Sequence, residues 1–89
     1  MNLLFDESFK KSIKKLDDTN IKKKLSKLIE SYEKATSITA ISGIKKMQGF
    51  KQFYRARIGD YRVGFELINT TTILFIIIEH RKNIYKNFP

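Results

Sequence analysis

The first third of the chain carries apolar residues at a helical spacing after a short apolar start. Residues 2–5 are apolar enough to form a short strand, and Asp6 is a suitable N-cap for a helix. Phe9, Ile13 and Leu16 then recur on one helix face, while lysines occupy the other faces. We therefore expect a strand followed at once by an amphipathic helix.

A second amphipathic helix is predicted after the polar turn Asp-Asp-Thr-Asn at residues 17–20, which also offers capping side chains. Its apolar positions are Ile21, Leu25, Leu28, Ile29 and Tyr32. The two helices should form an antiparallel hairpin, and residues 36–49 are predicted to be a loop.

From Phe50 onward the period of the pattern changes from 3.6 to 2, which is typical of half-buried strands. Between two such strands, Gly59 and Asp60 form a two-residue hairpin loop, and glycine at its first position favours a type II′ turn. After a polar turn at 69–71, the apolar run 73–78 does not alternate. That strand should therefore be central and covered on both faces.

The element order is thus βααβββ, which predicts an α+β fold with the helical hairpin packed on one face of a small antiparallel sheet. No repeat or linker interrupts residues 1–89, so they are predicted to form a single domain. The tail, residues 81–88, should form a short helix or an extended arm. The strand residues expected to face the helices are Tyr54, Ala56, Ile58, Tyr61, Val63 and Phe65.

The opposite sheet face should carry three arginines. A two-residue loop pairs Ile58 with Tyr61, which places Arg57 opposite Arg62 and Arg55 opposite residue 64. Like charges facing each other across strands cost stability, whereas a bound phosphate would turn that cost into a gain. A carboxylate such as Glu66 could instead neutralise the pair, but we favour phosphate binding.

Composition points to the same class of partner. Eighteen Lys and Arg against nine Asp and Glu give a formal net charge of +9, and a small basic domain usually meets a polyanion. The absence of cysteine excludes disulfide scaffolds, thiol catalysis and cysteine-based metal sites. With neither a signal peptide nor a membrane-length apolar run, we expect a cytoplasmic protein without a membrane partner.

Three residues near the C-terminal end have open interpretations. His80, the single histidine, could be a surface residue or a general acid or phosphate donor, and alone it makes no case for a metal. Tyr85 could stack on an RNA base. Phe88 could do the same, or it could anchor the tail to the sheet.

Three segments resemble the RelE/ParE toxin superfamily, in its RelE-like branch. The segments are Ile44–Gly49 (IKKMQG), Tyr54–Val63 (YRARIGDYRV) and His80–Tyr85 (HRKNIY). The second is similar to the family's Y-R-x-R-x-G-D-Y-R hairpin and the third to its H-R-x-x-I-Y ending. The βααβββ order agrees with the family along the whole chain.

The resemblance implies a toxin of a type II toxin–antitoxin system: a ribosome-dependent endoribonuclease that cleaves mRNA without a metal or cofactor. The implied partners are a cognate antitoxin, the ribosome and mRNA. The implied catalytic residues are Arg57, Arg62, Arg81 and Tyr85, and those expected to bind RNA are Lys45, Lys46, Arg55, His80 and Lys82.

One departure from the family concerns proton transfer. Well-studied members carry lysines where this chain has Arg55 and Arg57, and arginine practically never loses its proton. Lys45, Lys46, Tyr85 or His80, or the ribosomal RNA, would have to take that role. Two other functions stay open: a ParE-like toxin acting on DNA gyrase, and a non-catalytic nucleic-acid-binding protein.

Overall fold

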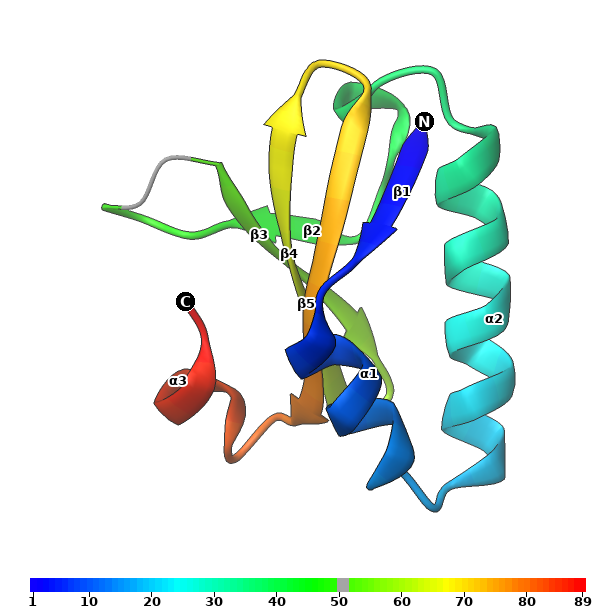
Figure 1. Cartoon of the computed structure of the whole chain (residues 1–89), viewed down its shortest axis with the longest axis vertical. Helices are drawn as coiled ribbons and strands as arrows, with labels where there is room; N and C mark the ends of the chain where they lie inside the picture. Colours follow the sequence, from blue (N-terminus) through cyan, green and yellow to red (C-terminus); the bar gives the residue numbers. More distant parts are fainter. Residues whose placement is uncertain (50–51) are drawn as a thin grey trace.

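The molecule is an α+β structure in which helices cover one face of a five-stranded sheet (Figure 1). The computed structural model describes residues 1–49 and 52–89, so Phe50, where the first alternating strand was expected to begin, lies outside it. The strands are β1 (Asn2–Phe5), β2 (Ile44–Lys46), β3 (Phe53–Ile58), β4 (Tyr61–Asn69) and β5 (Thr72–His80). The helices are α1 (Glu7–Lys14), α2 (Thr19–Lys34) and α3 (Ile84–Asn87), with a 3-10 turn at Ile38–Ala40.

Both predicted N-caps begin the helices of the hairpin. The Asp6 carboxylate accepts a hydrogen bond from the backbone N–H of Ser8 at 3.0 Å. The Asp18 carboxylate accepts from the N–H groups of Asn20 and Ile21 at 2.9 and 3.2 Å. These bonds satisfy backbone donors that lack partners inside the first helical turn, which is why the helices begin where the sequence indicated.

The strand order is β1-β5-β4-β3-β2, so the apolar strand β5 is indeed internal. The prediction of a wholly antiparallel sheet is wrong at one edge, because β1 pairs with β5 in parallel, Leu3 opposite Ile73. Parallel neighbours need a long crossover between them. Both helices and three strands lie between β1 and β5 along the chain, and they supply that crossover.

The segment predicted to be a loop, residues 36–49, contains a further strand. β2 pairs antiparallel with β3 and places Lys45 opposite Arg55 and Lys46 opposite Tyr54. With three residues, two of them exposed lysines, β2 has no apolar alternation to reveal it. Its pairing partner, rather than its own pattern, makes it a strand.

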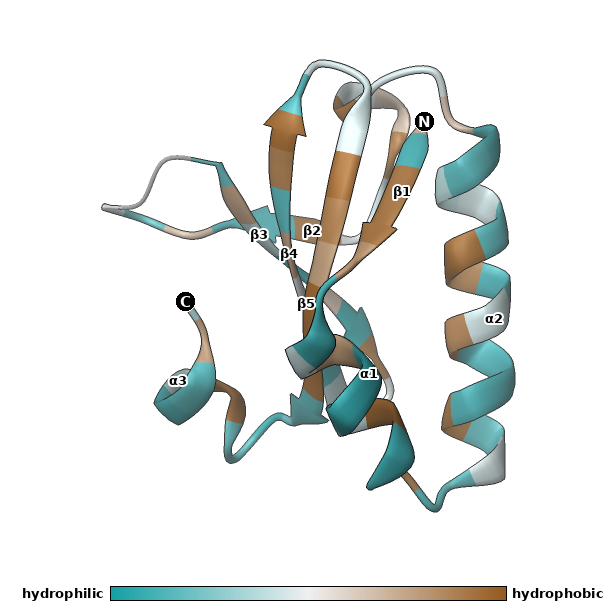
Figure 2. Ribbon diagram, viewed as in Figure 1, coloured by the Kyte–Doolittle hydropathy of each residue, from teal (hydrophilic) through white to brown (hydrophobic). Residues whose placement is uncertain are grey.

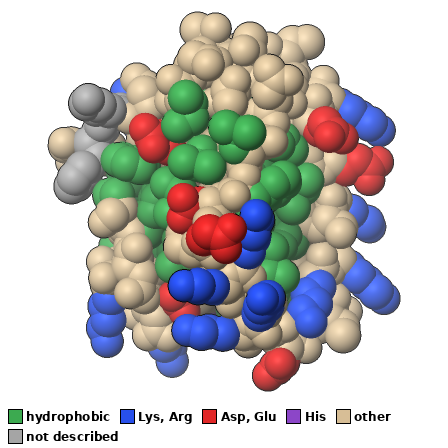
Figure 3. All heavy atoms as spheres, in the orientation of Figure 1, with side chains coloured by type: hydrophobic (Ala, Val, Ile, Leu, Met, Phe, Trp, Pro, Cys, Tyr) green, Lys and Arg blue, Asp and Glu red, His purple; other side chains and the backbone are tan. Residues whose placement is uncertain are grey.

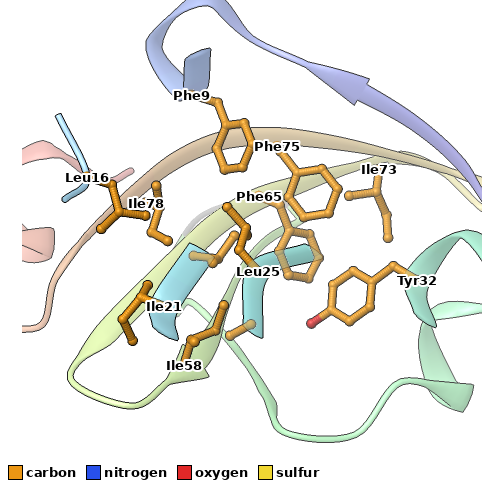
Figure 4. Close-up of a cluster of buried hydrophobic side chains, with 12 residues drawn as sticks. Phe9, Leu16, Ile21, Leu25, Tyr32, Ile58, Phe65, Ile73, Phe75 and Ile78 are labelled. Carbon is orange, nitrogen blue, oxygen red and sulfur yellow. The ribbon is translucent and has the colours of Figure 1, made fainter. Parts of the chain in front are cut away.

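The main core lies between the helices and the sheet, and it is built on aromatic contacts. The apolar stripe of α2 faces the sheet in Figure 2, and Figure 4 shows the side chains meeting between the layers. The Phe75 ring centroid lies 5.4 Å from that of Phe9 and 5.9 Å from that of Phe65. Tyr32 closes the cluster 5.6 Å from Phe65, and burial raises the pKa of Tyr32. The predicted helix-facing strand residues all belong to this core or pack against it.

A second, smaller core covers the other face of the sheet. It consists of Ile77, Ile84 and Phe88, with Phe53 packed perpendicular to the Phe88 ring at 5.6 Å. Phe88 is 2% exposed and lies directly on Gly64, where an added Cβ would come within 2.7–2.8 Å of the ring. The tail is thus a short helix anchored by an aromatic residue, as one of the sequence alternatives proposed, and β5 is covered on both faces.

No helix in the described part of the chain is long and apolar enough to cross a membrane.

The close packing of the Phe88 ring on Gly64 gives a first prediction. Gly64→Ala should lower the free energy of unfolding by about 1–3 kcal/mol, because the new methyl group overpacks against a buried ring. Urea midpoints measure the loss. In a Phe88→Ala background the same substitution should cost much less, since the clash is gone. Equal costs in both backgrounds would contradict this seating of the tail.

Candidate functional site

The β3–β4 hairpin places the arginines as its register predicted. Ile58 lies opposite Tyr61, Arg57 opposite Arg62, and Arg55 opposite Gly64. Gly59 has φ of 55°, and Asp60 has no positive φ, as in a type II′ turn. Directly opposed residues share a sheet face, so the three arginines lie on the face away from α1 and α2.

Strand β2 adds one more cation to the sheet face that carries Arg55, Arg57 and Arg62, called the arginine face below. Lys45 lies opposite Arg55 and therefore shares its face. Lys45, Arg55 and Gly64 thus form one row across three strands. Lys46 lies opposite Tyr54 and points to the other side. The structure thus brings Lys45 to the arginine face and leaves Lys46 away from it.

The arginine face contains a hollow of about 330 Å³ between the sheet and the tail. Its lining residues are Arg55, Arg62, Arg81, Lys82, Ile84 and Tyr85. The first two come from the sheet, and the other four come from the turn after β5 and from α3. Residues singled out from the sequence therefore meet around one cavity, and they are Arg55, Arg62, Arg81, Lys82 and Tyr85. Arg57 lies beside the cavity, directly opposite Arg62.

Arg62 is held by the backbone of its own hairpin. Its Nη1 donates to the carbonyl oxygens of Gly59 at 3.0 Å and Tyr61 at 2.9 Å. Burial lowers the pKa of Arg62, and the positive charges of Arg57, Arg55 and Arg81 lower it further. The predicted repulsion between like charges is therefore present on this face.

Carboxylates do not neutralise the Arg57–Arg62 pair within ion-pair distance among residues 1–49 and 52–89. Glu79 lies opposite Arg62 on β5, but its Oε2 accepts a hydrogen bond from Asn87 Nδ2 at 3.0 Å. Within the described part of the chain, the one ion pair near the hollow joins Arg81 Nε to Asp60 Oδ1 at 3.9 Å, and both side chains are largely exposed. The face thus keeps the excess positive charge that an anionic ligand would neutralise.

Tyr85 covers the guanidinium group of Arg55. The Arg55 Cζ lies 4.7 Å from the centroid of the Tyr85 ring, in the geometry of a cation–π contact, and Tyr85 is 67% exposed. Arg55, as a hydrogen-bond donor and as a positive charge, lowers the pKa of Tyr85, and Lys45 and Arg62 add to the effect. The phenol is therefore accessible and more acidic than a free tyrosine.

His80 does not join this cluster. It lies opposite Tyr61, and its ring packs edge-on against the Tyr61 ring at a centroid distance of 5.4 Å, so it points to the helix side of the sheet. Its Nδ1 accepts a hydrogen bond from the backbone N–H of Lys82 at 3.2 Å. The structure therefore does not bring His80 to the arginine face, and its role as an acid or phosphate donor stays a prediction. The strand's alternation places Glu79, not His80, beside Arg62.

Two residues that shape the site were not singled out from the sequence. Gly64 leaves the space in which Phe88 seats the tail, and Asp60 binds Arg81 through both its side chain and its carbonyl oxygen. An isolated glycine inside a strand does signal the close approach of another group, so Gly64 carried a usable hint. Asp60 carried none beyond its place in the turn.

Basic side chains also extend beyond the hollow. In Figure 3, Lys and Arg side chains gather along the lower rim and the right side of the molecule, over α1 and α2.

The described residues contain no group of three or more His, Asp or Glu placed to hold a metal ion. The residues that line the hollow offer fixed positive charges and the phenol of Tyr85, whose pKa is lowered.

The Arg55–Tyr85 contact gives a prediction on pH dependence. Arg55→Gln should raise the pKa of Tyr85 toward its ordinary value of 10, because it removes the largest cause of the shift. Added salt should act in the same direction by screening. The ring carbon shifts of Tyr85, followed by NMR against pH and assigned with Tyr85→Phe, measure this.

The lowered pKa of Tyr85 determines how its contribution to folding stability changes with pH. Ionised Tyr85 favours the folded state, so its contribution is complete above the unfolded pKa of about 10 and is lost as pH falls through the folded pKa. Arg57→Gln is the matched control, since Arg57 is not among the causes of the shift. An unchanged Tyr85 pKa in Arg55→Gln would show that the contact is absent in solution.

Comparison with known proteins agrees with this architecture. Residues 3–85 match the family described as ParE toxin of type II toxin–antitoxin system. The chain is 38% identical over 90 residues to Toxin RelE3 of Methanocaldococcus jannaschii, and the match covers 100% of each chain.

Solved structures show the same fold. The RelB–RelE antitoxin–toxin complex from Methanococcus jannaschii contains a chain with a TM-score of 0.81 and 37% identity, and the match covers 97% of this chain and 99% of that one. The toxin–antitoxin complex RelBE2 from Mycobacterium tuberculosis matches with a TM-score of 0.62 at 20% identity, over 90% and 96% of the two chains, which shows the fold alone. With its three motifs, its sheet order and its full-length relative in agreement, this chain belongs to the RelE/ParE family of toxins from type II toxin–antitoxin systems.

Proposed function

We propose that this toxin is a ribosome-dependent endoribonuclease that cleaves mRNA in the hollow between the sheet and the tail. The observation that carries the proposal is the meeting of Arg55, Arg62, Arg81 and Tyr85 around one cavity that no carboxylate neutralises within the described residues, apart from the exposed Asp60 contact. Guanidinium groups fork onto phosphate oxygens, and an aromatic ring beside them suits an RNA base.

The reaction would be attack by an RNA 2′-hydroxyl on its own adjacent phosphodiester. The bond from O2′ to phosphorus forms and the bond from phosphorus to O5′ breaks, which leaves a 2′,3′-cyclic phosphate and a free 5′-hydroxyl. This step needs in-line geometry, stabilisation of charge on the phosphorane oxygens and proton transfer at both ends. Arg62 and Arg81, with Arg57 beside them, would bind those oxygens.

Proton transfer falls most readily to Tyr85. Arg55 and Arg57 stay protonated, Lys46 points away from the hollow, and His80 lies on the other face. Tyr85 is exposed at the hollow, and the neighbouring cations lower its pKa. Lys45, in the same row as Arg55, and Lys82, which lines the hollow, would bind flanking phosphates. Without a strong acid–base pair, the free protein should be a poor ribonuclease, and the ribosome would orient the substrate.

The proposed partner that controls the toxin is a cognate antitoxin. The related RelE toxin was solved together with the antitoxin RelB. With a net charge of +9 and an uncompensated arginine face, this chain suits an antitoxin with an acidic segment. Together with a ribosomal target, such a partner implies a cytoplasmic site of action.

A second candidate is a ParE-like toxin that acts on DNA gyrase and leaves RNA intact. The family model that matches residues 3–85 carries the ParE name, which favours this reading. The full-length relative and the similar complex carry the RelE name, and such a toxin has no need of Arg81 and Tyr85 at one cavity. The ribonuclease is therefore the better supported proposal.

An experiment in cells that express the toxin tests whether mRNA is its substrate. Primer extension should show new cuts within coding frames, and the cuts should disappear when translation is blocked. Tyr85→Phe separates catalysis from binding, because it should keep RNA binding and lose cleavage. Intact transcripts with trapped gyrase–DNA complexes would favour the ParE-like toxin, and binding without any cleavage would favour a non-catalytic binding protein.

The arginine pair gives a prediction in which stability and activity move in opposite directions. Arg57→Ala should leave folding intact or raise the free energy of unfolding by at most about 1 kcal/mol, since it removes one cross-strand repulsion. Cleavage on programmed ribosomes should fall roughly 100- to 1,000-fold, the scale of losing one transition-state charge donor.

Arg62→Ala is the companion variant. It removes the same repulsion but also two hydrogen bonds to hairpin carbonyls, so its urea midpoint should not exceed that of Arg57→Ala. Unfolding of Arg57→Ala would assign that arginine a structural role. Parental cleavage by a folded Arg57→Ala variant would move the active site elsewhere.

A further inference from the structure

His80 ends β5, and the segment that follows it forms one wall of the hollow. Four of the six lining residues, from Arg81 to Tyr85, follow it within five positions of the chain. Its own ring lies on the other face of the sheet, edge-on to Tyr61 with an interplanar angle of 75°. Any influence of His80 on the hollow must therefore pass through the backbone.

The backbone of the turn depends on His80 for two of its three hydrogen-bond acceptors. The N–H of Arg81 donates to the Asp60 carbonyl oxygen at 2.8 Å, and the N–H of Asn83 donates to the His80 carbonyl oxygen at 2.8 Å. Between them, the N–H of Lys82 donates to His80 Nδ1 at 3.2 Å. This is the one donor of the three whose acceptor is a side chain, so it can be removed by substitution.

We propose that His80 is a positioning residue, whose Nδ1 fixes the turn that places Arg81, Lys82 and Tyr85 around the hollow. A ring nitrogen accepts a hydrogen bond only through its lone pair, so in the neutral imidazole the ring proton lies on Nε2. The edge-on contact with Tyr61 holds the ring in the plane that aims Nδ1 at the Lys82 N–H. The effect of this inference on cleavage rests on the proposed function, but its effect on the turn does not.

Three substitutions separate this role from its alternatives. His80→Asn places an amide oxygen near the position of Nδ1, and asparagine commonly accepts from the N–H two residues on. His80→Gln places its oxygen one bond further out, nearer the position of Nε2. His80→Ala removes the acceptor altogether. Urea midpoints establish that each variant is folded before its other properties are compared.

The first readout is the turn itself, in the free protein. Hydrogen exchange of the Lys82 amide and the NMR shifts of the Tyr85 ring should change in His80→Ala and His80→Gln and should stay close to the parental values in His80→Asn. The exchange of amides inside the β3–β4 pair is the internal control, because His80 supplies none of their acceptors. Parental exchange of the Lys82 amide in all three variants would overturn the inference.

The second readout is cleavage on programmed ribosomes. We expect kcat to fall roughly 10- to 100-fold in His80→Ala and His80→Gln, the scale of a small misplacement of catalytic groups, and to be largely retained in His80→Asn. If His80→Asn lost as much activity as His80→Ala while its Lys82 amide stayed protected, His80 would act chemically and the inference would fail. If the parental protein did not cleave ribosome-bound mRNA, the proposed function would fail, while the exchange of Lys82 would still decide the role of His80.

Discussion

The two-residue turn at Gly59 and Asp60 is the constraint on which the functional face depends. Because the turn admits one pairing of β3 with β4, it sends the apolar residues of both strands to the helices and their arginines to the opposite face. The same turn also holds the tail, since Asp60 contacts Arg81 through its carbonyl oxygen and its carboxylate. A register shift of one residue would bury the arginines and separate them from the tail.

The hollow is lined by two parts of the chain that differ in what holds them in place. Arg55 and Arg62 lie on paired strands inside the sheet, whereas Arg81 and Tyr85 lie on a turn and a four-residue helix. A helix that short has little stability of its own. It owes its position to Phe88 in the second core. The chemistry of the face therefore depends on a small apolar contact that itself bears no charge.

Much of this arrangement could be predicted from the sequence, and the exceptions have physical reasons. The helices, the hairpin register and the internal position of the apolar strand β5 follow from periodicity, caps and turn chemistry, which are local properties. The strand Ile44–Lys46 is too short and too polar to show a period, and the parallel pairing of β1 depends on distant partners. Most of the candidate site was predicted because motif and register agree. The face of His80 could not be predicted, because proximity to Arg81 along the chain does not indicate a shared face.

The packing of Phe88 on Gly64 also separates the stability of the scaffold from the completeness of the hollow. The main core contains no residue beyond β5, so its packing does not require the tail. Release of Phe88 would leave the helical hairpin and the sheet folded, while α3, which carries Tyr85, would lose its anchor. Such local unfolding would dismantle one wall of the hollow at a smaller cost in free energy than global unfolding.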